Sequence, residues 1–127
     1  MHMVQTDRAP LPAGHYSQAI VHGGMAFVSG QLPIDPATGA SAGESIEEQM
    51  EQALGNVAAI LDAAGSSLDR LLKVTVYLSD MSLWSRGNAV YERTLGEHRP
   101  ARAIVATLPL HYDYLVEIDA IAAVETD

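Results

Sequence analysis

Residues 45–65 read SIEEQMEQALGNVAAILDAAG, and this stretch decides the fold because it predicts one long amphipathic helix. Its apolar residues recur at the helical period and line a single face: Ile46, Met50, Leu54, Val57 and Leu61. Ser45 and Glu48 have the spacing of a capping box at the helix start, in which Glu48 reaches back toward Ser45. Gly65 supplies the C-terminal stop.

Strand-like segments lie on both sides of this helix. Five stretches have the composition or spacing of strands: residues 19–22, 25–29, 71–78, 101–108 and 115–124. Gly23-Gly24 between the first two is a two-residue hairpin signal. Pro109 and the polar turn region at residues 111–113 separate the last two.

A second helix is expected from Asp80 or Ser82 to about Gly96. Its buried stripe consists of four residues at spacings of 4, 3 and 4: Trp84, Asn88, Tyr91 and Leu95. The order hairpin, helix, strand, helix, strand, strand predicts an α+β fold with both helices on one face of a mixed sheet. A chain this short has no second layer for the other sheet face, so we expect oligomerisation to cover it.

The 127 residues have the length of one domain, and no linker, repeat or low-complexity tract divides them. We therefore expect a single domain over residues 1–127, with residues 1–12 as a partly flexible N-terminal extension. The absence of cysteine excludes disulfides, thiolate metal sites and a cysteine nucleophile, and it fits a reducing compartment. No signal peptide or bilayer-spanning apolar run is visible, so we expect a cytoplasmic protein.

The net charge of −9, from 16 acids against 7 bases, argues against polyanionic partners. Proteins that bind nucleic acid usually concentrate Lys and Arg on one face, whereas Lys73 and the six arginines are scattered along this chain. Nucleic acid and anionic membranes are therefore disfavoured as partners. A small anion held by one arginine is fully compatible with this charge.

Three polar residues interrupt apolar patterns and are the first candidates for a site. Arg102 opens a strand, where a guanidinium beside an apolar run must be paired or reach water. Glu117 and Asp119 share one strand face, opposite a wholly apolar one, so we expect a nearby cation or a wet cleft. Asn88 lies in the helical stripe and needs hydrogen-bond partners. Each also has a structural interpretation, as a surface arginine, a solvent-facing strand or a structural amide.

Other kinds of site have no support in the sequence. The five histidines, at positions 2, 15, 22, 98 and 111, show no metal-type pairing on one helix or strand, so no metal site is expected. No glycine-rich phosphate loop joins a strand to a helix, and no G-x-S-x-G motif is present.

Four blocks, in order and at near-family spacing, resemble the motifs of the Rid (YjgF/UK114) family, also described as the L-PSP endoribonuclease family. They are GHYSQA at residues 14–19, VSGQLPIDPATG at 28–39, NAVYE at 88–92, and PAR, LP and VEIDAIA at 100–102, 108–109 and 116–122. The family counterparts are G-P-Y-S-Q-A, S-G-Q-(I/L)-P-x-(D/N)-P-x-T-G, N-x-x-Y-x-x-(F/Y) and P-A-R…L-P…V-E-I-E-A-I-A. The resemblance as a whole runs from about residue 13 to residue 124.

The resemblance implies a chorismate-mutase-like α+β fold, assembled as a homotrimer around a central sheet barrel with sites between subunits. It implies hydrolytic deamination of small 2-imino or enamine acids, such as 2-iminopropanoate or 2-iminobutanoate, to 2-oxo acids and ammonia. No metal or organic cofactor is implied, because imines are already electrophilic. The expected partners are a small 2-imino or 2-oxo acid and other copies of the chain.

The resemblance also assigns roles to residues. Arg102 would grip the substrate carboxylate with a planar fork that lysine cannot imitate. Glu117 would orient a water or relay its proton to the departing ammonia, and Tyr16 would contact the ligand from the cleft wall. Four further residues would line the pocket or support its geometry: Ser29, Gly30, the backbone of Ile104, and Asn88.

Three departures from the family pattern bear on the substrate. His15 replaces the usual proline, Ile104 replaces a common cysteine, and the segment at residues 98–100 is shorter than in the deaminases. Ile104 and the shortened segment favour an alternative in which the protein binds a small carboxylate without catalysis. A third function, endoribonuclease or translation inhibitor, is disfavoured by the acidic charge.

Overall fold

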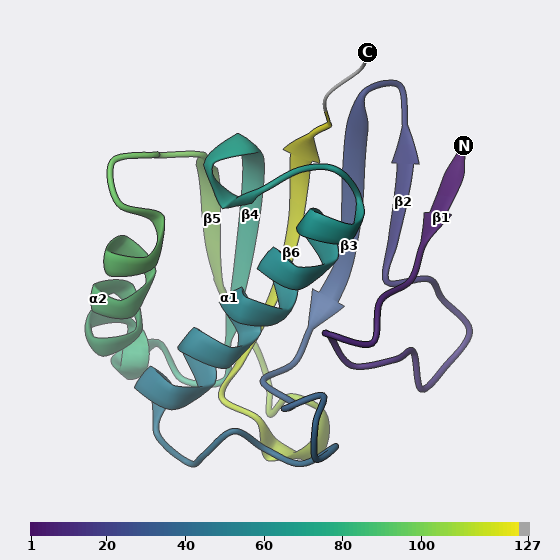
Figure 1. The fold of residues 1–127 in the computed structure, drawn as a ribbon. Coiled ribbons are helices and arrows are strands. Elements are labelled where there is room, and N and C mark those ends of the chain that lie inside the picture. Colours follow the sequence, from purple (N-terminus) through teal and green to yellow (C-terminus); the bar gives the residue numbers. More distant parts are fainter. Residues whose placement is uncertain (125–127) are drawn as a thin grey trace.

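Two helices cover one face of a six-stranded sheet in this computed structural model, which describes residues 1–124 (Figure 1). The helices are α1 (Ile46–Ala63) and α2 (Trp84–Leu95). The strands are β1 (His2–Val4), β2 (Ala19–His22), β3 (Met25–Gln31), β4 (Leu71–Leu78), β5 (Ala101–Ala106) and β6 (Val116–Ala123). Their spatial order is β1-β2-β3-β6-β4-β5, and only the β4–β5 pair is parallel. The predicted α+β fold with a mixed sheet is confirmed.

Helix α1 begins and ends where the sequence predicts. The Ser45 hydroxyl accepts a hydrogen bond from the Glu48 N–H and donates one to the Glu48 carboxylate, at 3.1 and 2.8 Å. The five predicted apolar positions of α1 are all buried. Gly65 follows the helix with a φ of +84°, a conformation that glycine adopts without steric cost. Within residues 1–124, no helix is both long and apolar enough to cross a membrane.

The sheet has one covered and one open face. Along β6, Val116, Ile118 and alternate residues beyond them are buried beneath the helices, while Glu117 and Asp119 lie on the other side. The open face also carries Phe27 and Val105, which are 42% and 39% exposed. Apolar side chains on an uncovered sheet face are typical of a surface that another protein chain covers. Oligomerisation through this face stays a prediction.

The N-terminal segment contributes to the sheet. Residues His2–Val4 form β1 and pair with β2, with Val4 opposite Ala19. The chain after β1 is held by the buried side-chain amide of Gln18, which donates to the carbonyls of Thr6 and Pro10 at 3.0 and 2.8 Å. The Gln18 oxygen accepts from the Thr6 N–H at 2.7 Å. Strand β1 and Gln18 therefore tie part of the N-terminal segment to the rest of the domain.

Helix α1 holds the long loop after β3 through a buried amide. The Asn56 side chain is fully buried and donates to the carbonyls of Leu32 and Ile34 at 3.0 and 2.9 Å. Its oxygen accepts from the Gln52 amide at 2.9 Å. Two carbonyls of the loop are thereby fixed to a single position of the helix.

Substitution of Asn56 by alanine is expected to destabilise the fold by about 1–3 kcal/mol, because two carbonyls and one amide lose their buried partner. Urea unfolding at a fixed chain concentration measures this free energy. Glu51→Ala on the exposed side of the same helix is the control and should change stability by less than about 0.5 kcal/mol. Equal stabilities for the two variants would contradict the assignment.

Candidate functional site

The guanidinium of Arg102 is held by three side chains of α2. Its Cζ lies 4.9 Å from the ring centroids of both Trp84 and Tyr91. Its Nη1 donates to the Asn88 oxygen at 3.0 Å, and the Asn88 amide donates to the Glu92 carboxylate at 3.0 Å. Cation–π contacts of this kind contribute about 0.5–1 kcal/mol each at exposed sites. Arg102 is therefore oriented by its neighbours while it remains accessible to an anion.

A groove of about 640 Å³ lies beside this arginine and is lined by Arg99, His98 and Tyr91 as well as Arg102. The Tyr91 hydroxyl is buried and has no hydrogen-bond partner within residues 1–124. Burial raises the pKa of Tyr91, and the positive charge of Arg102 opposes that increase. The groove thus gathers two of the six arginines of an acidic chain beside one carboxylate, Glu92, and this positive balance suits a small anion.

Glu117 lies on the open face and packs against Gly30. A Cβ built on Gly30 would lie 2.9 Å from the Glu117 Cδ, so only glycine leaves room for this carboxylate in its present position. The Ser29 hydroxyl donates to the Ser17 carbonyl at 2.6 Å, which joins β3 to the segment before β2. Tyr16 and Gly30 line a second pocket of about 290 Å³.

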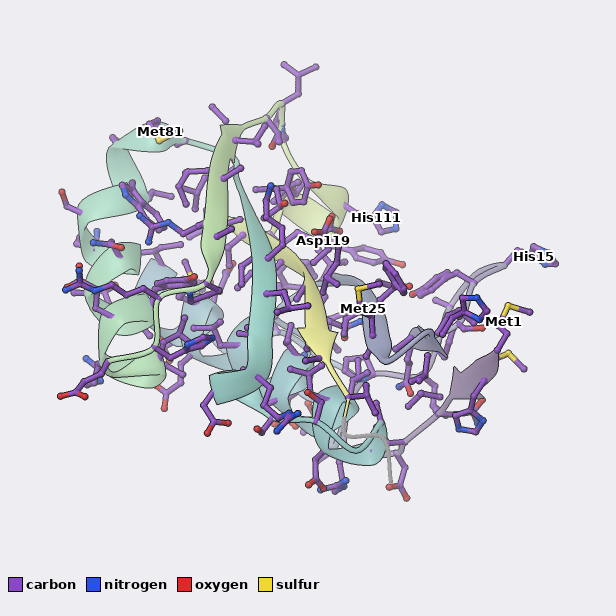
Figure 2. The ribbon with its side chains drawn as sticks, turned by 90° about the horizontal axis from the view of Figure 1, so that it is seen from above. Met1, His15, Met25, Met81, His111 and Asp119 are labelled. Atoms are coloured by element: carbon purple, nitrogen blue, oxygen red, sulfur yellow. The ribbon has the colours of Figure 1, made fainter. Side chains whose placement is uncertain are left out.

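Burial raises the pKa of Glu117, and the negative charge of Asp119 raises it further, while His111 lowers it. Asp119 itself accepts a hydrogen bond from the Tyr77 hydroxyl at 2.8 Å, and this bond raises the pKa of Tyr77. Figure 2 shows His111 and Asp119 near each other in projection, away from Met81 before α2. A raised pKa makes this carboxyl a better proton acceptor than an ordinary surface glutamate.

The Arg102 and Glu117 clusters do not meet within one chain. Arg102 pairs in register with Val74, which is buried under the helices, whereas Glu117 pairs with Tyr77 on the open face. The two residues are also separated by β4, which places their strands about 10 Å apart. One small acid cannot contact both side chains of the same molecule.

The predicted site residues therefore divide into two half-sites. The first half-site, on α2 and β5, contains Arg102, Asn88 and Ile104; the second contains Tyr16, Ser29, Gly30 and Glu117. Asn88 was expected to be buried but is partly exposed, because it lies at the border of the helical stripe and faces Arg102.

Sequence reasoning missed two features of these half-sites. It assigned Trp84 and Tyr91 to the core and did not foresee that both rings contact Arg102. Their spacing on one helix face, shortly before a strand that opens with arginine, was the available signal. It also treated His111 only as a turn residue, although His111 acts electrostatically on Glu117.

Residues 6–124 match the family described as Endoribonuclease L-PSP. The chain belongs to this family. It is the Rid family that the sequence motifs resemble, so the predicted membership is confirmed. Among its relatives, the 2-iminobutanoate/2-iminopropanoate deaminase of Salmonella typhimurium is 41% identical over 122 residues, which cover 94% of each chain.

Solved structures of Rid relatives agree closely with this fold. A crystal structure from Thermotoga maritima is 49% identical with a TM-score of 0.95, and the match covers 99% of each chain. E. coli TdcF with bound serine is 36% identical with a TM-score of 0.94, over 98% of this chain and 100% of TdcF. The arrangement of elements around both half-sites is thus a Rid fold.

The Glu117 carboxyl is expected to titrate above the ordinary value of 4.5 because it is half-buried and faces Asp119. Carbon NMR of the side-chain carboxyls measures this pKa directly. Asp119→Asn removes a negative neighbour and should lower the pKa of Glu117, whereas His111→Gln removes an opposing charge and should raise it. Shifts in the same direction for the two variants would disprove this electrostatic account.

Proposed function

We propose that this Rid protein hydrolyses small 2-imino acids to 2-oxo acids and ammonia, in sites formed between the subunits of a homotrimer. The observation that carries the proposal is the division of the site: an oriented arginine and a half-buried carboxylate lie on different surfaces of one chain. A deaminase among its relatives, at 41% identity, supports the reaction class.

The proposed assembly brings together two different surfaces of the chain, one with Glu117 and one with Arg102. The open sheet face carries Glu117 and exposes Phe27 and Val105, and β5 with Arg102 forms a sheet edge. When the Arg102 side of one copy docks against the Glu117 side of the next, two different patches meet, and repeated contacts of this type close into a ring. A ring of three subunits has three equivalent sites, each built from both half-sites.

In such a site Arg102 binds the substrate carboxylate through two parallel hydrogen bonds. The Glu117 carboxylate accepts a proton from water as the water oxygen bonds to C2 of the protonated imine, which gives a tetrahedral carbinolamine. Glu117 then returns that proton to the nitrogen. As the C2–N bond breaks and C2 becomes a carbonyl, Glu117 takes the hydroxyl proton and passes it to the departing ammonia, which leaves as ammonium. Holding both reactants in place replaces a bimolecular encounter with an oriented one.

The other residues of the half-sites have supporting roles in this proposal. Tyr16 and Gly30 line the wall next to Glu117, and Ser29 holds that wall through its hydrogen bond to the Ser17 carbonyl. Asn88 fixes the plane of the Arg102 guanidinium. Serine, which is bound in E. coli TdcF, has the carboxylate and C2 nitrogen of a 2-imino acid, and this supports a substrate of the amino-acid type.

A second candidate function is the binding of a small carboxylate without turnover. The half-buried, apolar Ile104 favours it, because this residue brings no polar group to the Arg102 half-site. Thermal shift with 2-oxobutanoate, combined with an ammonia-release assay, separates the two functions. Endoribonuclease activity is disfavoured by the net charge of −9.

Arg102→Ala and Arg102→Lys should each lower kcat/KM on 2-iminobutanoate roughly 10²-fold or more, because neither side chain provides the planar fork. Activity is measured as ammonia released from imine generated by an amino-acid oxidase. Arg86→Ala, which removes an exposed arginine paired with Glu47 at 2.7 Å, is the matched control and should keep full activity. An active Arg102→Ala trimer would refute the proposal.

Gly30→Ala should lower kcat roughly 10- to 100-fold, because the new methyl group displaces the Glu117 carboxylate. The fold should tolerate the change, since the displaced atoms end a flexible side chain. Gly55→Ala on α1, where an added Cβ meets no atom within 4 Å, controls for the gain of a methyl group. Undiminished turnover by Gly30→Ala would remove Glu117 from the mechanism.

A further inference from the structure

We infer that the pocket between Tyr16 and the loop at His111–Asp113 binds the side chain of the substrate and selects 2-imino acids with an aromatic or branched aliphatic side chain. This inference rests on the proposed function and specifies its substrate class. Three observations support it: the left-handed backbone of the loop, the hydrogen bonds that fix the opposite wall, and the position of the pocket beside Glu117.

The loop holds two aromatic rings outside the core, and its backbone adopts a conformation that is unfavourable for residues other than glycine. Tyr112 and Asp113 have φ values of +59° and +60°, although neither is glycine. Such residues cost on the order of 1–3 kcal/mol each and persist where surrounding structure fixes them, often at functional sites. Tyr112 is 67% exposed and lies against His111, with ring centroids 3.8 Å apart. Core packing does not explain this conformation.

The end of the loop is firmly anchored. Tyr114 is buried and its ring meets Tyr112 edge-on, with centroids 6.1 Å apart. The next residue, Leu115, donates its N–H to the buried Gln49 side chain of α1 at 2.8 Å. The rings of His111 and Tyr112 are thus presented by a fixed support.

The opposite wall of the pocket is equally fixed. It consists of Pro10, Leu11 and Tyr16, and the amide of Gln18 holds this segment through the Pro10 carbonyl. The floor includes Leu32 and Ile34, whose carbonyls are bound by Asn56. The lining contains no Asp, Glu, Lys or Arg within residues 1–124, so the pocket suits an apolar group.

The pocket opens beside the proposed reaction centre. Gly30 lines it and directly contacts Glu117, and His111 lines it while acting on the charge of Glu117. The C2 atom of a 2-imino acid is trigonal and carries a carboxylate, a nitrogen and a side chain. When the carboxylate points to Arg102 and the nitrogen to Glu117, the side chain occupies the remaining substituent direction of C2. This direction leads to the apolar pocket next to Glu117.

The volume of the pocket indicates the size of that side chain. The pocket measures about 290 Å³, and an apolar cavity of roughly 150 Å³ accommodates benzene. A methyl group would leave most of this space to water, whereas an isobutyl or phenyl group fits. Each methylene placed in such a pocket changes specificity roughly 10- to 200-fold at most, and aromatic rings gain further from edge-to-face contact with tyrosine.

The test compares imines generated in situ by amino-acid oxidases from phenylalanine, leucine and alanine, at equal rates of supply. Tyr112→Asn removes the ring but keeps a residue that tolerates the left-handed backbone. Asp113→Asn is the matched control, because it lies at the adjacent strained position and does not line the pocket. We expect the wild type to favour the two larger imines at least tenfold, Tyr112→Asn to lose this preference, and Asp113→Asn to retain it.

A wild type without preference, or a Tyr112→Asn variant equally impaired on all three imines, would overturn the inference. Calorimetric titration with phenylpyruvate and pyruvate distinguishes failure of this inference from failure of the proposed function. If no imine is turned over, tighter binding of phenylpyruvate that is lost in Tyr112→Asn still supports the pocket. Equal binding of the two acids, or no binding of either, overturns it.

Discussion

The register between β4 and β5 places Arg102 opposite Val74, on the face of the sheet that the helices cover. Because β5 is an edge strand, the guanidinium reaches the border of the sheet and packs against α2 instead of entering the core. Glu117 is fixed to the other face by its own register with Tyr77. Strand pairing therefore keeps Arg102 and Glu117 apart within one chain, and the proposed chemistry depends on a second copy of the chain.

Buried amides perform a common task around the second half-site. Gln18, Gln49 and Asn56 are all buried, and each binds backbone groups of a segment without regular structure. A loop has no ladder to satisfy its backbone, so a side-chain amide that both donates and accepts is a suitable substitute. The walls near Glu117 are thus formed before a ligand arrives.

Much of the fold follows from the sequence because its signals are local. The apolar period of residues 45–65, the alternation along residues 115–124 and the Gly23-Gly24 turn each predicted the element that forms. Strand β1 was not predicted, since three residues are too few for a period and its partner residues lie 15 or more positions away. The loop at Tyr112 could not be foreseen either, because tyrosine gives no sign of a left-handed backbone.

The candidate site was less predictable than the fold. Motifs identified Arg102, Glu117 and Gly30, but a helical stripe cannot distinguish an aromatic ring in the core from one that contacts a cation. Whether the half-sites combine depends on contacts between chains, which no periodicity within one chain encodes. Trp84 therefore packs against the core and also contacts Arg102, and only the first of these could be predicted from the stripe.

The contacts around Arg102 also affect the thermodynamics of ligand capture. A free arginine side chain has about 2 kcal/mol of rotamer entropy, which a ligand must remove if it is to hold the guanidinium in one orientation. Here Trp84, Tyr91 and Asn88 restrict those torsions while the chain folds. The side-chain entropy of Arg102 is therefore lost on folding and not on ligand binding. A metabolite with very few atoms can then be retained long enough to react.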